Sequence, residues 1–154
     1  MTSISKIFVT ASLITSILVV STGIFAHRGA TGVVKDRMVL MKEMGKAMKT
    51  ISKMVRGKAH LDMTKLIKAA ELIGDQSRQI DTLFPKGSGD GHTEASLKIW
   101  QDRAGFRESA RMLGSAADSL RAAATKKQPK MIKSAFRTLG KSCSSCHRLY
   151  RSKK

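Results

Sequence analysis

Apolar side chains recur every three or four residues along most of the chain beyond its first 30 residues, a spacing that is typical of amphipathic helices. The first such stretch predicts a helix over 34–55. Gly57 is expected to follow its end, because glycine readily takes the backbone conformation that terminates helices. The apolar stripe of this helix consists of Val34, Met38, Met41, Met48, Ile51 and Val55.

A second helix is predicted over 63–83, with Asp62 as its N-cap. The segment that follows it, FPKGSGDGHTEAS, contains one proline and three glycines and is therefore predicted to be a loop. The apolar stripe of the second helix consists of Leu66, Ile67, Ala70, Leu72, Ile73 and Ile80, and Leu83 and Phe84 close it.

The second half of the chain repeats the helical pattern. After a short turn at LKIW, a third helix is predicted over 102–125. Pro129 suits the first turn of a fourth helix, where its missing N–H costs nothing, and this helix is predicted to run to about Arg151. Four helices joined mainly by short connections predict an all-α protein that folds as an antiparallel four-helix bundle. The apolar face of the third helix comprises Phe106, Ala110, Leu113, Ala116, Ala117, Leu120 and Ala124.

The first 26 residues follow a different pattern, with one lysine, no acidic residue and a long run of apolar or small residues after Lys6. This order is typical of a secretory signal that is cut after Ala26. However, Ile24 is not small, and the run approaches the length of a membrane span of about 20 residues, so an uncleaved anchor is the alternative. We therefore expect a signal peptide or N-terminal anchor over 1–26, a single helical domain over 27–154, and a periplasmic location.

Lysine and arginine outnumber aspartate and glutamate by 29 to 11, which gives the chain a formal charge of +18. A strongly cationic surface speeds encounter with acidic proteins or with anionic lipid headgroups. We therefore expect an acidic partner protein or an anionic membrane surface, and the alternative is a set of solvated lysines without a docking role. Nucleic acid is not expected as a partner, because aromatic residues for base stacking are scarce.

Both cysteines, Cys143 and Cys146, lie in the C-terminal segment LGKSCSSCHRLYR, with His147 directly behind them. A structural zinc site needs four ligands, and the chain has no second cysteine pair. A redox dithiol of the thioredoxin kind lies at the start of a helix that follows a strand, whereas this motif falls late in a predicted helix. A disulfide between the two would close a very short loop and would leave His147 without a role.

The remaining interpretation is covalent attachment of a c-type haem, for which C-x-x-C-H is the motif. On a helix, Cys143 and Cys146 share one face and can both react with haem vinyl groups, while His147 presents its imidazole to the iron. Helical bundles hold cofactors of this kind between facing helices. We therefore predict one covalently bound haem c per chain, in a protein that carries electrons or binds a ligand and is not an enzyme.

From about Lys35 to Arg151 the chain resembles the class II cytochromes c, which comprise cytochrome c prime and its relative cytochrome c-556. The resemblance rests on RMVLM in the first helix, FPKGS in the loop, KIW with Trp100, GF at Gly105 and Phe106, and the terminal GKSCSSCHRLYR. It implies a four-helix bundle with one covalent haem near the C-terminal helix. Members of this family often form a homodimer through their first two helices.

The resemblance also places Met41 on the opposite side of the haem from His147 and implies one of two outcomes. In the c-556 branch the methionine sulfur is the sixth iron ligand, and the protein transfers single electrons. In the c-prime branch the side chain packs over the iron without bonding it, which leaves a site open for NO or CO. The alternative for Met41 is an ordinary core position. We expect one-electron transfer with an acidic redox partner, and gas binding is the alternative function.

Two arginines complete the expected site. The resemblance implies that Arg37, four residues before Met41, projects toward the haem, where its guanidinium can pair with a propionate. The alternative for Arg37 is a solvated charge. Arg151 would lie beside the proximal face of the haem if the last helix continues, and otherwise it would be a solvated residue at a frayed chain end.

Overall fold

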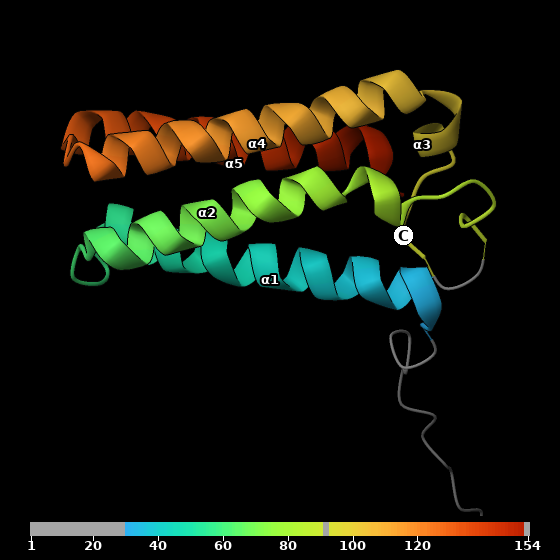
Figure 1. The fold of residues 1–154 in the computed structure, drawn as a ribbon, viewed down its shortest axis with the longest axis horizontal. Coiled ribbons are helices and arrows are strands. Elements are labelled where there is room, and N and C mark those ends of the chain that lie inside the picture. Colours follow the sequence, from blue (N-terminus) through green and yellow to red (C-terminus); the bar gives the residue numbers. More distant parts are fainter. Residues whose placement is uncertain (1–29, 91–92, 153–154) are drawn as a thin grey trace, which may run out of the picture.

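The computed structural model describes residues 30–90 and 93–152, and the expected signal peptide or anchor over 1–26 lies outside these residues. Four long helices form an antiparallel bundle, in which the pair α1 and α2 lies beside the pair α4 and α5 (Figure 1). This arrangement confirms the predicted all-α four-helix bundle. Within the described ranges no helix is both long and apolar enough to span a membrane. The long helices are α1 Gly32–Val55, α2 Met63–Gln79, α4 Arg103–Thr125 and α5 Pro129–Tyr150.

The helix ends follow local sequence signals. Asp62 accepts a hydrogen bond from the backbone N–H of Lys65 at 3.0 Å and caps α2, as predicted. Gly57 follows α1 with a φ of +71°, a conformation that glycine adopts without strain. Pro129 occupies the first turn of α5.

The second helix ends earlier than the predicted 83. After Gln79 the chain tightens into a 3₁₀ turn, η1 Asp81–Leu83, and a short helix, α3 Lys98–Gln101, follows the loop. The physical reason is an arginine from α4 that competes for the backbone carbonyls. Arg103 donates to the carbonyl oxygens of Asp81 and Phe84, at 2.8 Å each, and so draws this segment away from a helical path.

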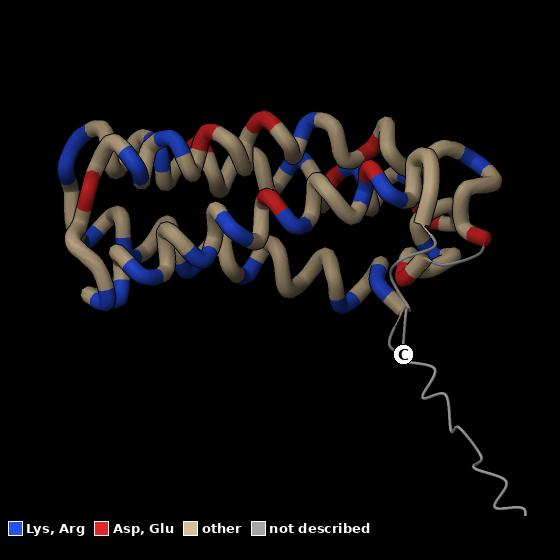
Figure 2. The backbone as a smooth tube through the Cα atoms, turned by 90° about the horizontal axis from the view of Figure 1, so that it is seen from below, with Lys and Arg blue, Asp and Glu red and all other residues tan. Residues whose placement is uncertain are grey.

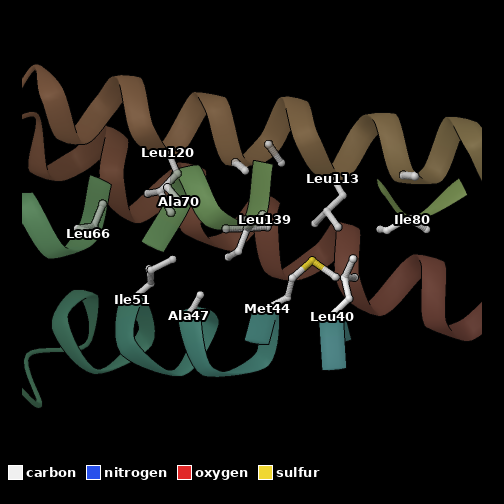
Figure 3. Packing of buried hydrophobic residues seen from close by; sticks show 14 of the residues in the cluster. Leu40, Met44, Ala47, Ile51, Leu66, Ala70, Ile80, Leu113, Leu120 and Leu139 are labelled. Carbon is white, nitrogen blue, oxygen red and sulfur yellow. The ribbon is translucent and has the colours of Figure 1, made fainter. Parts of the chain in front are cut away.

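The core runs along the length of the bundle, with large aliphatic side chains from all four long helices meeting at its centre (Figure 3). Leu66 of α2, Leu120 of α4 and Leu139 of α5 have no exposed surface. Helices α2 and α4, and α4 and α5, pack against each other extensively, whereas α1 and α5 make far less contact. The bundle is therefore least tightly closed between its first and last helices.

The core face of α1 differs from the predicted stripe. The buried apolar residues of α1 are Leu40, Met44, Ala47, Ile51 and Met54, and only Ile51 belongs to the predicted set. Val34 and Met41 are half-buried, and Met38 is 36% exposed. The prediction was wrong about which residues are fully buried, because α1 carries two overlapping apolar stripes, but Met41, Met48 and Val55 are half-buried and pack against the core. Leu72 of α2, also predicted to be buried, is 37% exposed.

A small polar junction ties the end of α5 to the start of α4. The Tyr150 hydroxyl donates to Asp102 at 2.7 Å, and the same carboxylate accepts from the backbone N–H of Gly105 at 3.1 Å. A Cβ atom at Gly105 would lie 2.5 Å from the Asp102 carboxylate and 2.6 Å from the Tyr150 hydroxyl. Glycine is therefore required at position 105 for this close approach.

Gly105→Ala is expected to lower the free energy of unfolding by about 1–3 kcal/mol, because the added methyl group crowds both partners of the junction. Gly45→Ala is the matched control. Gly45 is exposed within α1, a Cβ atom there would have no neighbour within 4 Å, and alanine should stabilise the helix by up to about 1 kcal/mol. Urea denaturation followed by circular dichroism measures both changes. A Gly105→Ala protein as stable as the parent would contradict this account of the junction.

Candidate haem-binding site

A cavity of about 740 Å³ opens between α1 and α5, at the end of the bundle where η1, the following loop and α3 lie. Its volume falls within the range of cofactor pockets, and most of its lining is apolar. It lies between α1 and α5, which make less contact with each other than the other packed pairs of long helices do. The apolar residues that line it include Val34, Met38, Met41, Ile80, Phe84, Ile99 and Phe106.

The α5 wall of the cavity carries the C-x-x-C-H motif. Cys146 and His147 line the cavity, and Cys143 lies one turn earlier on the same helix, packed against the core. Both cysteines are half-buried on the inner side of α5. Gly140, one turn before Cys143, adds no side chain, and even a Cβ atom there would have no neighbour within 4 Å. Cys146 and His147 therefore face the cavity, while Cys143 packs against the core one turn earlier on α5.

The pKa values of these groups argue against a redox dithiol and suit iron ligation by His147. Burial raises the pKa of the Cys143 thiol, and burial together with Cys143 raises the pKa of Cys146 to about 11. A redox dithiol has lowered thiol pKa values instead. Desolvation lowers the pKa of His147, and the positive charge of Arg151 lowers it further. The imidazole is therefore neutral near pH 7, with a lone pair available to a metal.

The α1 wall of the cavity carries Met41. Its side chain lines the cavity and is half-buried, whereas Met44, one turn further on, is 7% exposed and fills the core (Figure 3). These two neighbouring methionines of α1 therefore take different places, Met44 in the core and Met41 in the cavity wall. Met41 and His147 lie on the two helices that bound the cavity, in keeping with the predicted arrangement.

Arg37 is not the solvated charge that was one alternative for it. The residue is only 5% exposed, and burial lowers the pKa of its guanidinium. Its Nε donates to the carbonyl oxygen of Leu83, and its terminal nitrogens donate to the carbonyl oxygen of Ser88, at 2.9 Å, and to the Ser88 hydroxyl. The guanidinium also lies 4.2 Å from the centre of the Phe84 ring. Arg37 thus anchors the loop after α2 to the cavity wall.

Arg151 is neither part of a continuing helix nor frayed. Helix α5 ends at Tyr150, and Arg151 adopts extended backbone and forms an antiparallel bridge with Ala95. Its Nε donates to the Glu94 carboxylate at 2.7 Å. The helix stops here because the segment before α3 takes over its hydrogen bonds, with the Ser96 N–H donating to the Tyr150 carbonyl oxygen at 3.0 Å. Arg151 still lines the cavity, beside His147.

Three aromatic side chains, Phe84, Phe106 and Tyr150, line the cavity. Phe106 packs edge-on against both Phe84 and Tyr150, with ring centroids 4.9 and 5.3 Å apart. Trp100 packs against Phe84, and its indole N–H donates to the Pro85 carbonyl oxygen at 2.8 Å. Sequence reasoning missed Tyr150 and Glu94 as cavity residues. The position of Tyr150, one turn after His147 on the same helix, was a signal that could have placed it there.

The residues of the cavity fit a covalently bound haem. Two half-buried thiols three residues apart can hold one edge of the macrocycle, and a neutral imidazole follows directly. The apolar lining suits a flat, largely apolar group. In addition, the loose contact between α1 and α5 gives such a group room between two helices.

Comparisons with known proteins also point to a protein that carries covalent haem. The family model described as Cytochrome C' matches residues 32–151. The chain is 35% identical to a cytochrome c' of Rhodopseudomonas palustris over 125 residues, which cover 80% of this chain and 84% of that one. It is 32% identical to a cytochrome c-556 of Agrobacterium tumefaciens, over 80% of this chain and 99% of that one.

Among solved structures, a nitric oxide complex of a cytochrome c prime variant from Alcaligenes xylosoxidans is similar to this fold. Its TM-score is 0.73 at 28% identity, over 79% of this chain and 94% of that one. The family match runs from the start of α1 to the residue after α5, so it covers all four long helices and the C-x-x-C-H motif. The chain therefore belongs to the cytochrome c' family and carries covalently bound haem c.

Proposed function

We propose that this protein is a monohaem cytochrome that transfers one electron at a time, with haem c attached through Cys143 and Cys146. His147 and Met41 are the proposed iron ligands. Haem c supplies an iron that changes between its ferric and ferrous states. The observation that carries this proposal is the position of Met41 in the cavity wall, while Met44 fills the core. Ligation by histidine and methionine raises the haem potential and closes the iron to other ligands.

The cavity lining would tune this cofactor. Its apolar side chains limit access of water, and a dry, apolar shell shifts the potential of a metal site. Lys35, Lys42 and Arg151 are exposed and line the cavity. These cations support the expectation of an acidic redox partner that docks over the haem edge. The signal-like sequence over 1–26 supports a periplasmic location.

Arg37 is proposed to stabilise a haem propionate. Its buried guanidinium has five N–H groups, and three of the hydrogen bonds that it donates go to loop atoms. No carboxylate of the described residues lies within salt-bridge distance of it. A buried cation without an ionic partner is costly, and a propionate in the adjoining cavity would supply one.

A second candidate function is the binding of small gases at a five-coordinate iron. The nitric oxide complex of the related cytochrome c prime variant supports it, as does the similarity to both branches of the family. In that case Met41 would pack over the iron without bonding it. The two candidates share the same attachment site and differ only in what the sulfur of Met41 does.

The visible spectrum of the reduced protein distinguishes the two candidates. Electron transfer with Met41 as ligand predicts sharp low-spin bands that CO does not change, and Met41→Ala should convert them into a high-spin spectrum that CO shifts. Met44→Ala is the matched control, which should lower the free energy of unfolding by about 2–5 kcal/mol without changing the spin state. A parent protein that is already high-spin and binds CO would support the gas-binding candidate instead.

Attachment of the haem can be tested by serine substitution. The double variant Cys143→Ser/Cys146→Ser should lose all haem on a denaturing gel, because neither thioether bond can form. Each single variant should keep one bond. Ser144→Ala and Ser145→Ala, between the two cysteines, should keep the haem staining of the parent. Haem that stays on the denatured double variant would contradict attachment at these residues.

The proposed role of Arg37 predicts a shift of the midpoint potential. Arg37→Gln should lower the potential, because the lost positive charge favoured the reduced haem. Arg103→Gln is the matched control, since Arg103 binds carbonyls of the same segment but already has Asp81 as its ionic partner, at 2.7 Å. Redox titration measures both. Equal shifts of the potential in the two variants would contradict a direct effect of the Arg37 charge, because loss of the contacts to the loop would then explain both shifts.

A further inference from the structure

The positive charge of this chain is concentrated at one end of the bundle. This basic end consists of residues 52–66 and 121–133, where α1 turns into α2 and α4 turns into α5 (Figures 1 and 2). It has nine basic residues and a single acidic one, Asp62, whereas the rest of the described chain has sixteen basic and ten acidic residues. The nine are Lys53, Arg56, Lys58, Lys65, Arg121, Lys126, Lys127, Lys130 and Lys133.

Most of these cations have no ionic partner. Lys65 lies 3.5 Å from Asp62, and Arg121 lies 3.7 Å from Asp118. Among the residues that the structure describes, the other seven have no carboxylate within salt-bridge distance. Like charges gathered within about a Debye length of one another reinforce a single positive potential. The basic end therefore presents a strong cationic field to solvent.

Exposed apolar side chains lie among these cations. Leu61, in the turn between α1 and α2, is 36% exposed, and Met131, in the first turn of α5, is 57% exposed. Surfaces that combine lysine or arginine with exposed apolar groups suit the headgroup region of a bilayer, where the cations meet phosphates and the apolar groups reach the acyl boundary.

The basic end is far from the haem. His147 lies eighteen residues after Pro129 on α5, so the helix rise separates the two by about 27 Å. An acidic redox partner docked on the basic end would be held away from the cofactor. A bilayer surface needs no approach to the haem, because it only holds the protein in place. The position of the charge thus favours anionic lipid over a redox protein at this end.

We propose that the basic end docks on anionic phospholipid headgroups and holds the haem cavity away from the bilayer. The cations supply the attraction, and Leu61 and Met131 add apolar contacts at the same end. This docking surface does not depend on how the iron is ligated. A failure to bind lipid would therefore leave the proposed electron-transfer function unaffected.

Co-sedimentation of the haem-loaded full chain with vesicles tests this proposal. Vesicles of equal parts phosphatidylglycerol and phosphatidylcholine should bind the protein at low ionic strength, and binding should fall as salt is added. Vesicles of phosphatidylcholine alone should bind it weakly. The variant Lys58→Glu/Lys126→Glu/Lys130→Glu should lose binding to the anionic vesicles by about tenfold or more, because three exposed cations of the basic end are reversed.

Lys86→Glu/Lys98→Glu/Lys141→Glu is the matched control, with the same change of net charge at exposed positions outside the basic end. It should keep vesicle binding within about twofold of the parent. Equal loss in both triple variants would overturn the proposal, because net charge alone would then account for binding. Absence of binding to the anionic vesicles would also overturn it. Any retained N-terminal anchor would contribute equally to all three proteins and would not respond to salt.

Discussion

The loose packing between α1 and α5 is the feature on which the rest of this structure depends. Two helices of a four-helix bundle normally close on each other along their whole length, but here a cavity of about 740 Å³ lies between them at one end. Tight packing of α2 with α4 and of α4 with α5 keeps the bundle together around this opening. The opening offers room for a haem group, and it decides which side chains of α1 and α5 could face a cofactor there.

Polar contacts at both ends of the segment between α2 and α4 stabilise the walls of this cavity. Arg37 and Arg103 bind backbone carbonyls of the segment after α2, so that Phe84 is fixed in the wall of the cavity. On the other side, Tyr150 binds Asp102, and Arg151 binds Glu94. These contacts use side chains from α1, α4 and α5 together. They hold the described parts of the segment between α2 and α4, residues 80–90 and 93–102, around the site.

Much of this architecture could be predicted from the sequence, because helix ends are set locally. Asp62, Pro129 and Gly57 mark helix boundaries through their own backbone chemistry, and the structure confirms them. The C-x-x-C-H motif likewise indicates haem attachment through its residue spacing alone.

The core face of α1 could not be predicted in the same way. Consecutive apolar residues from Met38 to Met41 fit two stripes equally well, and only the tertiary packing shows that Leu40 faces the core. The loop contacts of Arg37 were equally hidden, since their partners lie about fifty residues away.

The central claim is that Cys143 and Cys146 hold the haem on the wall of this cavity. Mass spectrometry of a tryptic digest tests it most directly, because cleavage after Lys141 and Arg148 releases the segment SCSSCHR with both cysteines. In the haem-loaded protein, the mass of this peptide should exceed that of the unmodified peptide by the mass of one haem. A peptide of unmodified mass, with haem recovered free in the digest, would contradict it.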